Sequence, residues 1–118
     1  MKKFFCLIIG LLVLVGCSSS VDKFVTYMEA KEKIINENAI LLDVRTEEEY
    51  SEDHIDGAIL LPLDSINKEN IEKIINDKEQ VIIVYCRSGN RSSQALSLIE
   101  ELGYNEVYDL GAMSNWEE

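Results

Sequence analysis

The chain changes from strand to helix within Val81-Ile-Ile-Val-Tyr-Cys86-Arg-Ser-Gly-Asn-Arg91-Ser-Ser93. Residues 81–85 are apolar or aromatic and suit a strand that is buried on both faces. Residues 92–102 have the pattern of a helix. Cys86 therefore falls at a strand-to-helix turn, where unpaired backbone N–H groups and the positive end of the helix dipole favour an anion.

Two permanent positive charges, Arg87 and Arg91, lie close to Cys86 in the sequence. A thiol with a pKa of about 8.5 in water ionises more easily in such surroundings, and the thiolate is the reactive form. We therefore interpret Cys86 as a nucleophile. The competing interpretation is an inert buried cysteine. Packing alone, however, gives no reason for two arginines and a glycine within five residues of it.

The loop from Cys86 to Arg91 resembles the active-site loop of the rhodanese sulfurtransferase family, in which a cysteine opens a six-residue loop that an arginine closes. Phosphatases related to that fold have a loop one residue longer, and this chain has Ser92 where their arginine would stand. The resemblance implies that Cys86 carries sulfur as a persulfide, while the loop binds the anionic substrate. The residues of this predicted binding loop are Arg87, Ser88, Gly89, Asn90, Arg91 and Ser92.

A second motif, upstream of the cysteine loop and independent of it, resembles the same family. Its parts are Asp43-Val44-Arg45, Glu49-Tyr50, His54-Ile55 and Gly57-Ala58. Asp53 stands where the family usually has a glycine before the histidine. The closing segment, residues 111–116, resembles the family's Gly-Gly and tryptophan segment, with Ala112 in place of one glycine. The resemblance thus extends over residues 24–116.

Asp43 and Arg45 are supporting candidates, because the ends of strands line the ligand crevice in open α/β sheets. Two roles suit Asp43 equally: it holds Arg91 or a loop N–H in place, or it caps the next short helix. Arg45 suits an ion pair as well as a contact with substrate. We expect His54 to make a fixed hydrogen bond rather than act as a base. Residues 47–49 are expected to form a solvated acidic turn at a helix start.

Strand and helix patterns alternate along the chain, which predicts an α/β fold. Thr26 and Glu29 have the spacing of a capping box at the start of a first helix, and Gly103 follows a later helix as a stop. The expected helices cover residues 26–38, a short stretch near 49–50, 67–76 and 92–102, and the expected strands cover 39–44, 59–63, 81–85 and 105–110. We predict a single rhodanese-like domain with a mostly parallel central sheet of about five strands and helices on both faces.

The N-terminus has the pattern of a bacterial export signal. A basic start precedes an apolar stretch, residues 4–15, which is too short for a comfortable membrane span of ~20 residues. Leu14-Val15-Gly16-Cys17 resembles the lipobox of bacterial lipoproteins, in which the cysteine is lipidated and becomes the new N-terminus. We expect a signal peptide in residues 1–16, a lipidated cysteine and short linker in 17–23, and the folded domain in 24–118. An ordinary signal peptide or an uncleaved anchor is the alternative.

This interpretation makes the protein a lipid-anchored, exported protein of the bacterial cell envelope, on the membrane surface or in the periplasm. With the first sixteen residues removed, nine basic residues remain against 22 acidic ones, a formal charge of −13. Such a surface repels nucleic acid and anionic headgroups, so the expected membrane contact is the lipid on Cys17. One histidine and one unmodified mature cysteine do not make a usual zinc site, so neither a metal nor a cofactor is expected.

By resemblance, the expected activity is that of a thiosulfate sulfurtransferase. Its partners would be a small anionic sulfur donor and a thiol or cyanide acceptor, with a protein acceptor left open. A cysteine-based phosphatase or arsenate reductase is a rival that the loop length opposes. A non-catalytic binding or sulfide-carrier module is a second rival, and redox sensing through a sulfenic acid on Cys86 is a third.

Overall fold

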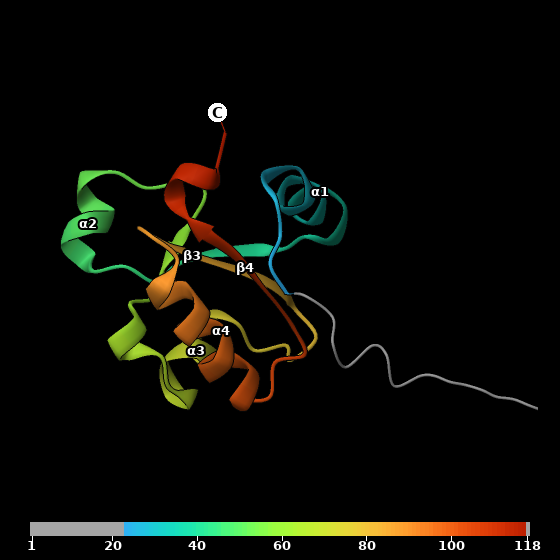
Figure 1. Ribbon diagram of the computed structural model, residues 1–118. Coiled ribbons are helices and arrows are strands. Elements are labelled where there is room, and N and C mark those ends of the chain that lie inside the picture. Colours follow the sequence, from blue (N-terminus) through green and yellow to red (C-terminus); the bar gives the residue numbers. More distant parts are fainter. Residues whose placement is uncertain (1–22, 118) are drawn as a thin grey trace, which may run out of the picture.

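The computed structural model describes residues 23–117 and contains one parallel sheet in the order β2-β1-β3-β4 (Figure 1). The strands are β1 (Ile40–Asp43), β2 (Ile59–Leu60), β3 (Val81–Cys86) and β4 (Glu106–Ala112). The helices are α1 (Tyr27–Glu37), α2 (Glu47–Glu52), α3 (Lys68–Ile74) and α4 (Asn90–Glu101), with short 3-10 turns η2 (Leu63–Ser65) and η3 (Met113–Asn115). The predicted α/β fold with a parallel sheet is confirmed.

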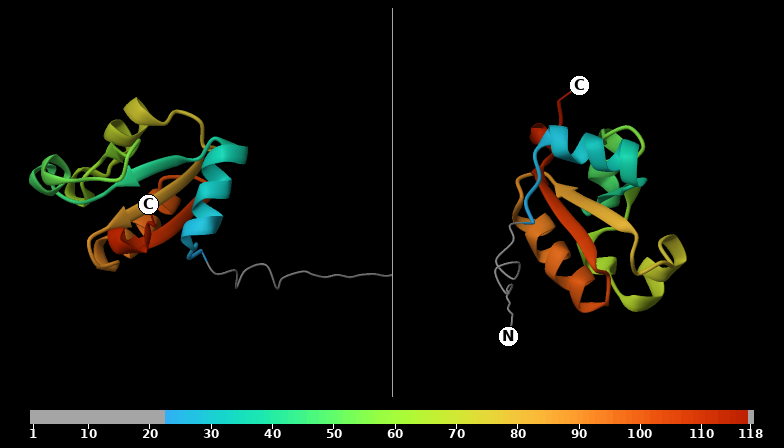
Figure 2. Two further views of the ribbon diagram at one scale, coloured as in Figure 1. Left: turned by 90° about the horizontal axis from the view of Figure 1, so that it is seen from above. Right: turned by 90° about the vertical axis from the view of Figure 1, so that its right-hand side faces the viewer.

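Helices cover both faces of the sheet, as predicted. One core lies under α3 and α4, and its strand residues include Leu42, Val84 and Val107. The other core lies under α1 and contains Leu41 and Ile83 from the same strands. Neighbouring strand residues thus point to opposite cores, because side chains alternate across a strand. The right-hand view of Figure 2 shows α1 and α4 on opposite sides of the strands.

Local sequence signals set the helix ends. Thr26 and Glu29 form the predicted capping box at the start of α1, and a second box, Thr46 with Glu49, starts α2. Gly103 follows α4 with a φ of 102°, a left-handed conformation that favours glycine. The residues that determine these helix ends lie within a few positions of one another in the sequence. The ends therefore do not depend on contacts with distant segments.

Met28, Ala30, Ile34 and Ile35 have the spacing of an imperfect apolar stripe on the first helix, and the structure buries only part of that stripe. Ala30 is buried, but Met28 and Ile35 expose 72% and 70% of their surface. Ala30 lies in the core under α1, and the half-buried Ile34 packs against the same core. Met28 and Ile35 therefore lie on the solvent side of α1.

A fifth strand is reduced to a single bridge along the outer edge of β4. Phe24 pairs in parallel with Asp109, where Val25 N–H donates to Asp109 O and Asp109 N–H donates to Lys23 O, each at 2.9 Å. Figure 2 shows this light-blue entry segment running beside the red strand β4. A Cβ atom on Gly111 would lie 2.8 Å from the Phe24 ring, so the absence of a side chain at Gly111 lets the ring lie on the strand.

The predicted signal peptide and the lipidated Cys17 lie outside the described residues. Within residues 23–117, no helix is both long enough and apolar enough to cross a membrane. The parallel strands all finish at one edge of the sheet, so Asp43 of β1 and Cys86 of β3 end near the same crevice.

Candidate active site

Cys86 is the last residue of β3, and it belongs to the core that α4 covers. The chain then turns sharply and enters α4 at Asn90. Gly89 makes this turn with a φ of 101°, a conformation that a residue with a side chain rarely adopts. The turn brings the backbone back over the Cys86 sulfur, as the strand-to-helix pattern predicted.

Two backbone N–H groups point at the Cys86 sulfur. Gly89 N–H donates to Sγ at 3.0 Å, and Ser92 N–H donates to Sγ at 3.3 Å. Asn90 and Ser88, also predicted for this loop, are exposed at its outer side. The loop therefore binds the sulfur chiefly through main-chain donors, which is the arrangement that stabilises an anion.

The electrostatic balance at Cys86 favours the thiolate. Burial raises the pKa of the thiol and is the largest single influence, but hydrogen bonds from the Ser92 backbone and hydroxyl and from the Gly89 and Ser88 backbone lower it. Together they hold the pKa of Cys86 below its ordinary value. The sulfur is fully buried, with 0% of the residue exposed. A molecule from solvent therefore reaches the sulfur only when neighbouring groups move aside.

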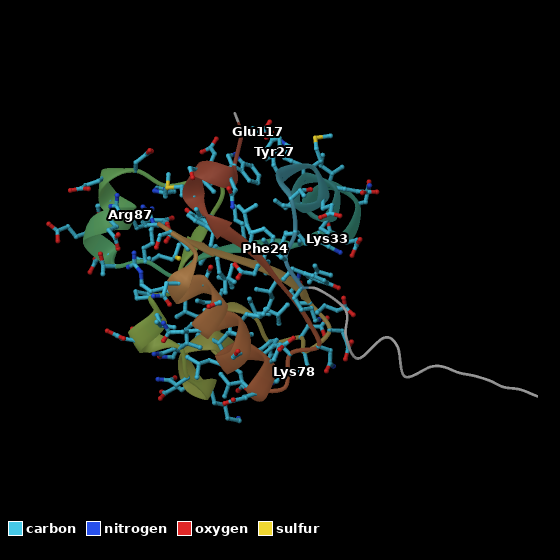
Figure 3. The ribbon with its side chains drawn as sticks, viewed as in Figure 1. Phe24, Tyr27, Lys33, Lys78, Arg87 and Glu117 are labelled. Atoms are coloured by element: carbon cyan, nitrogen blue, oxygen red, sulfur yellow. The ribbon has the colours of Figure 1, made fainter. Side chains whose placement is uncertain are left out.

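The two loop arginines meet one carboxylate that the sequence interpretation assigned to solvent. Arg91 Nη1 and Nη2 donate to the two oxygens of Glu49 at 2.7 and 3.0 Å, and Arg87 Nε donates to Glu49 Oε2 at 3.0 Å. Glu49 lies on α2, and Figure 3 shows Arg87 reaching toward that helix. We call this three-residue arrangement the Glu49 clamp. It ties the cysteine loop to α2.

The clamp holds Glu49 in its charged form. The pKa of Glu49 lies far below its usual value of 4.5. The hydrogen bond from Arg91 is the largest cause, and the backbone N–H of Thr46 and the hydrogen bond from Arg87 also lower the pKa. Burial raises it, but by less than these hydrogen bonds lower it. A carboxyl whose pKa is lowered in the folded state stabilises the fold above the unfolded pKa. That stabilisation is therefore fully present above about pH 4.5 and is lost as the pH falls toward the folded pKa.

Asp43 binds Arg45 and Tyr85, whereas Arg91 binds Glu49. Arg45 Nε and Nη2 donate to the Asp43 carboxylate at 2.9 and 2.7 Å, and the Tyr85 hydroxyl donates to it at 2.7 Å. Holding Arg91 and capping α2, two roles considered for Asp43, therefore belong to Glu49 and to Thr46. The ion-pair role considered for Arg45 is the one found, and its Nη2 also donates to Asp53 O at 2.6 Å.

His54 makes the fixed contact that was expected. Its Nδ1 lies 2.8 Å from Tyr50 O, and the two rings stack with their centroids 3.7 Å apart. Tyr50 in turn donates its hydroxyl to Ala58 O at 2.7 Å, which closes the turn after α2. Within residues 23–117, no group of three or more His, Cys, Asp and Glu side chains is arranged to hold a metal ion.

Glu49 is a site residue that the sequence interpretation missed, although a local signal marks its position in α2. Thr46 and Glu49 have the same spacing as Thr26 and Glu29, which is the spacing of a capping box. This spacing predicts Glu49 at the third position of α2. Its partners Arg87 and Arg91 lie 38 and 42 residues away, and that contact depends on the sheet order.

The curated proteins that are similar to this chain include two that are named thiosulfate sulfurtransferase. The chain is 38% identical over 74 residues to thiosulfate sulfurtransferase PspE of Escherichia coli (strain K12), covering 63% of this chain and 70% of the relative. It is 34% identical over 95 residues to thiosulfate sulfurtransferase GlpE of Coxiella burnetii (strain RSA 493 / Nine Mile phase I), covering 80% of this chain and 86% of the relative.

Solved structures and a family model agree with these relatives. The solved structure of a rhodanese with anions from E. coli is 36% identical, with a TM-score of 0.62. The match covers 65% of this chain and 89% of the chain in that structure. The human single-domain sulfurtransferase TSTD1 is 24% identical, with a TM-score of 0.67 and coverage of 81% and 96%, and supports the fold alone. The family model described as a rhodanese-like domain matches residues 26–118. The chain therefore belongs to the rhodanese-like domain family.

Proposed function

We propose that this protein is a sulfurtransferase that moves a sulfane sulfur from a small anionic donor such as thiosulfate to a thiol or cyanide acceptor. The Cys86 thiolate attacks the outer sulfur of thiosulfate and forms a persulfide bond. The bond between the two donor sulfurs breaks, and sulfite leaves with the electron pair. The acceptor then attacks the outer sulfur of the persulfide, and Cys86 departs as a thiolate.

The observation that carries this proposal is the pair of N–H groups from Gly89 and Ser92 on the Cys86 sulfur. These donors stabilise negative charge on the thiolate before attack and again when the acceptor takes the sulfur. Arg87 and Arg91 supply positive charge for the anionic donor at the same loop. The similarity to two proteins named thiosulfate sulfurtransferase supports the same donor class.

We also propose that the domain is held at the bacterial cell envelope by a lipid on Cys17, as the lipobox-like sequence indicates. Metabolic labelling with a fatty-acid analogue tests this placement. Wild type should take up the label, and Cys17→Ala should not.

Intact-protein mass spectrometry tests the transfer reaction. A soluble form of residues 18–118 keeps every described residue and has Cys86 as its sole cysteine. We expect thiosulfate to add one sulfur atom to this protein, and cyanide to remove that atom as thiocyanate. Protein alkylated at Cys86 beforehand serves as the control and should gain nothing. If reduced, alkylatable Cys86 takes no sulfur from thiosulfate or another sulfane donor, the proposal is wrong.

The Glu49 clamp gives a kinetic prediction. We expect Glu49→Gln to lower the KM for thiosulfate by roughly threefold to tenfold, because the donor no longer competes with a carboxylate for the two arginines. The kcat should change less, since the N–H groups on the sulfur remain. Glu48→Gln, which removes an exposed charge from the same helix, is the matched control. An unchanged or raised KM in Glu49→Gln would contradict competition by the clamp.

A further inference from the structure

The outer face of α1 carries the two most exposed large apolar side chains of residues 23–117, Met28 and Ile35. These residues stand two helical turns apart, so their side chains lie on the same face of α1. Ala30 lies on the opposite face, in the core under α1. The helix is therefore apolar toward the sheet and has a second apolar strip toward solvent.

A mainly apolar groove of about 480 Å³ follows this outer face and is lined by Met28, Lys31 and Ile35, among others. Aromatic rings flank it, because Lys31 Nζ lies 5.9 Å from the centroid of the Tyr27 ring and 5.6 Å from that of Trp116. Apolar side chains beside lysine and aromatic rings are typical of a helix that lies at the boundary between lipid and water.

The negative charge of the domain is concentrated away from α1. Residues 23–38 contain three lysines and three glutamates and are formally neutral, whereas residues 39–118 contain six basic and 18 acidic residues, a formal charge of −12. The repulsion between the domain and anionic headgroups is therefore weakest at α1. Within the outer face, the exposed Glu32 lies between Met28 and Ile35 and opposes contact with such headgroups.

The proposed lipid on Cys17 would bring this helix close to a bilayer. Residues 18–22 separate Cys17 from Lys23, and these five residues span at most about 18 Å when extended. The chain then begins α1 at Tyr27. Figure 1 and the left-hand view of Figure 2 show α1 and the light-blue entry segment on one side of the molecule and α2 on the far side. The anchor therefore attaches on the side of the molecule that carries α1.

We propose that the outer face of α1 rests on the bilayer to which the protein is anchored, with Met28 and Ile35 at the edge of the acyl chains and Lys31 among the headgroups. This inference rests on the proposed lipid on Cys17, because two apolar side chains alone bind a bilayer weakly, and anchoring supplies the high local concentration that they need. In this orientation α2 and the cysteine loop that it holds through the Glu49 clamp face the solution, from which donor and acceptor arrive.

A bilayer suits this face better than a second copy of the chain. A stable protein interface buries roughly 800 Å² on each partner. The outer face of α1 offers less than that, since a helix of 11 residues is about 16 Å long. A bilayer requires no such minimum area when a covalent lipid already holds the protein at its surface.

Fluorescence of Trp116 tests the proposal. It is the only tryptophan, and its ring packs edge-on against Tyr27 with the centroids 4.9 Å apart. In residues 17–118 with Cys86→Ser, Cys17 is the sole thiol and can be coupled to a maleimide lipid in vesicles of phosphatidylcholine and phosphatidylglycerol. Brominated phosphatidylcholine quenches a tryptophan beside the acyl chains, and we expect it to lower the fluorescence by roughly a third or more. A coupled protein without quenching would overturn the proposal.

Variants of the outer face show whether α1 makes the contact. We expect Met28→Ser with Ile35→Ser to reduce the quenching by at least about half, since both exposed side chains lose their apolar surface. Glu32→Gln should increase the quenching, because it removes a carboxylate that faces anionic headgroups. Leu98→Ser, which changes an exposed side chain on α4, is the matched control and should be quenched like wild type. Equal quenching in wild type and the double variant would contradict docking through α1.

Sedimentation of residues 18–118 tests the other occupant, a second copy of the chain. We expect a monomer, and a dimer that Met28→Ser with Ile35→Ser breaks would overturn the proposal by assigning the face to a protein contact. Chemical coupling supplies the anchor whether or not the cell adds a lipid, so the quenching reports on the face of α1 alone. Metabolic labelling of Cys17 tests the anchor separately, and a failure of either proposal is thereby distinguished from a failure of the other.

Discussion

Replacing Cys86 with serine is expected to reduce sulfur transfer from thiosulfate by roughly a thousandfold or more, because a serine hydroxyl ionises far less readily than a thiol. The Gly89 and Ser92 N–H groups stay in place in the variant, yet they have no thiolate to stabilise. Serine is close in size to cysteine, and its hydroxyl oxygen can accept hydrogen bonds from the same two N–H groups. We therefore expect the variant to keep the fold. Thiocyanate production in the presence of cyanide measures the loss, and thermal unfolding checks the fold.

Ser88→Ala is the matched control for this loss. Ser88 is exposed on the same loop, and its effect on Cys86 comes from its backbone, which alanine retains. We expect its rate of transfer to stay within about twofold of wild type. A Cys86→Ser protein that still formed thiocyanate at a rate near wild type would show that the sulfur is carried elsewhere.

Replacing Arg45 with methionine is expected to lower the free energy of unfolding by about 3–5 kcal/mol, because the change leaves Asp43 buried without its cation. Asp43 exposes 0% of its surface, and the guanidinium group of Arg45 is hydrogen-bonded to both of its oxygens. Methionine keeps much of the aliphatic packing, so the loss reports mainly the unpaired charge. Denaturation in urea, followed by circular dichroism, measures it.

Lys68→Met is the control for removing a cation from an ion pair. Lys68 pairs with Glu72 at 3.3 Å, but its side chain is mostly exposed, so we expect a change below about 1 kcal/mol. The double variant Asp43→Asn with Arg45→Met should recover part of the loss, because no buried charge remains. A loss below 1 kcal/mol in Arg45→Met would mean that water reaches Asp43 in the folded protein.

Sequence reasoning predicted the features that short segments determine. The capping box of Thr26 and Glu29 involves residues three apart, and the continuous apolar run of β3 marks a strand buried on both faces. The turn at Gly89 follows from the same local pattern. These signals were enough for the parallel α/β fold and for the position of Cys86 at the end of a central strand.

The contacts that organise the candidate site join residues that are far apart in the sequence, and no local pattern predicts such contacts. Glu49 reaches Arg91 across 42 residues because α2 and the cysteine loop meet at the same edge of the sheet. Asp43 binds Tyr85 across 42 residues because β1 and β3 are neighbours in the sheet. Such contacts are fixed by the order and register of the strands, which the sequence indicated only in outline.

The bridge between the entry segment and β4 has a mechanical consequence. Any force on the chain before Lys23 acts first on the hydrogen bonds at Asp109 and on the Phe24 ring that lies against Gly111. Figure 3 shows Phe24 over the strand that carries both residues. Gly111 in turn lies 3.9 Å from the position of a Cβ on Gly89, the residue that turns the chain over the Cys86 sulfur. Tension on the N-terminal side therefore acts on the strand that packs beside the turn of the sulfur site, as well as on Val25 of the core under α1.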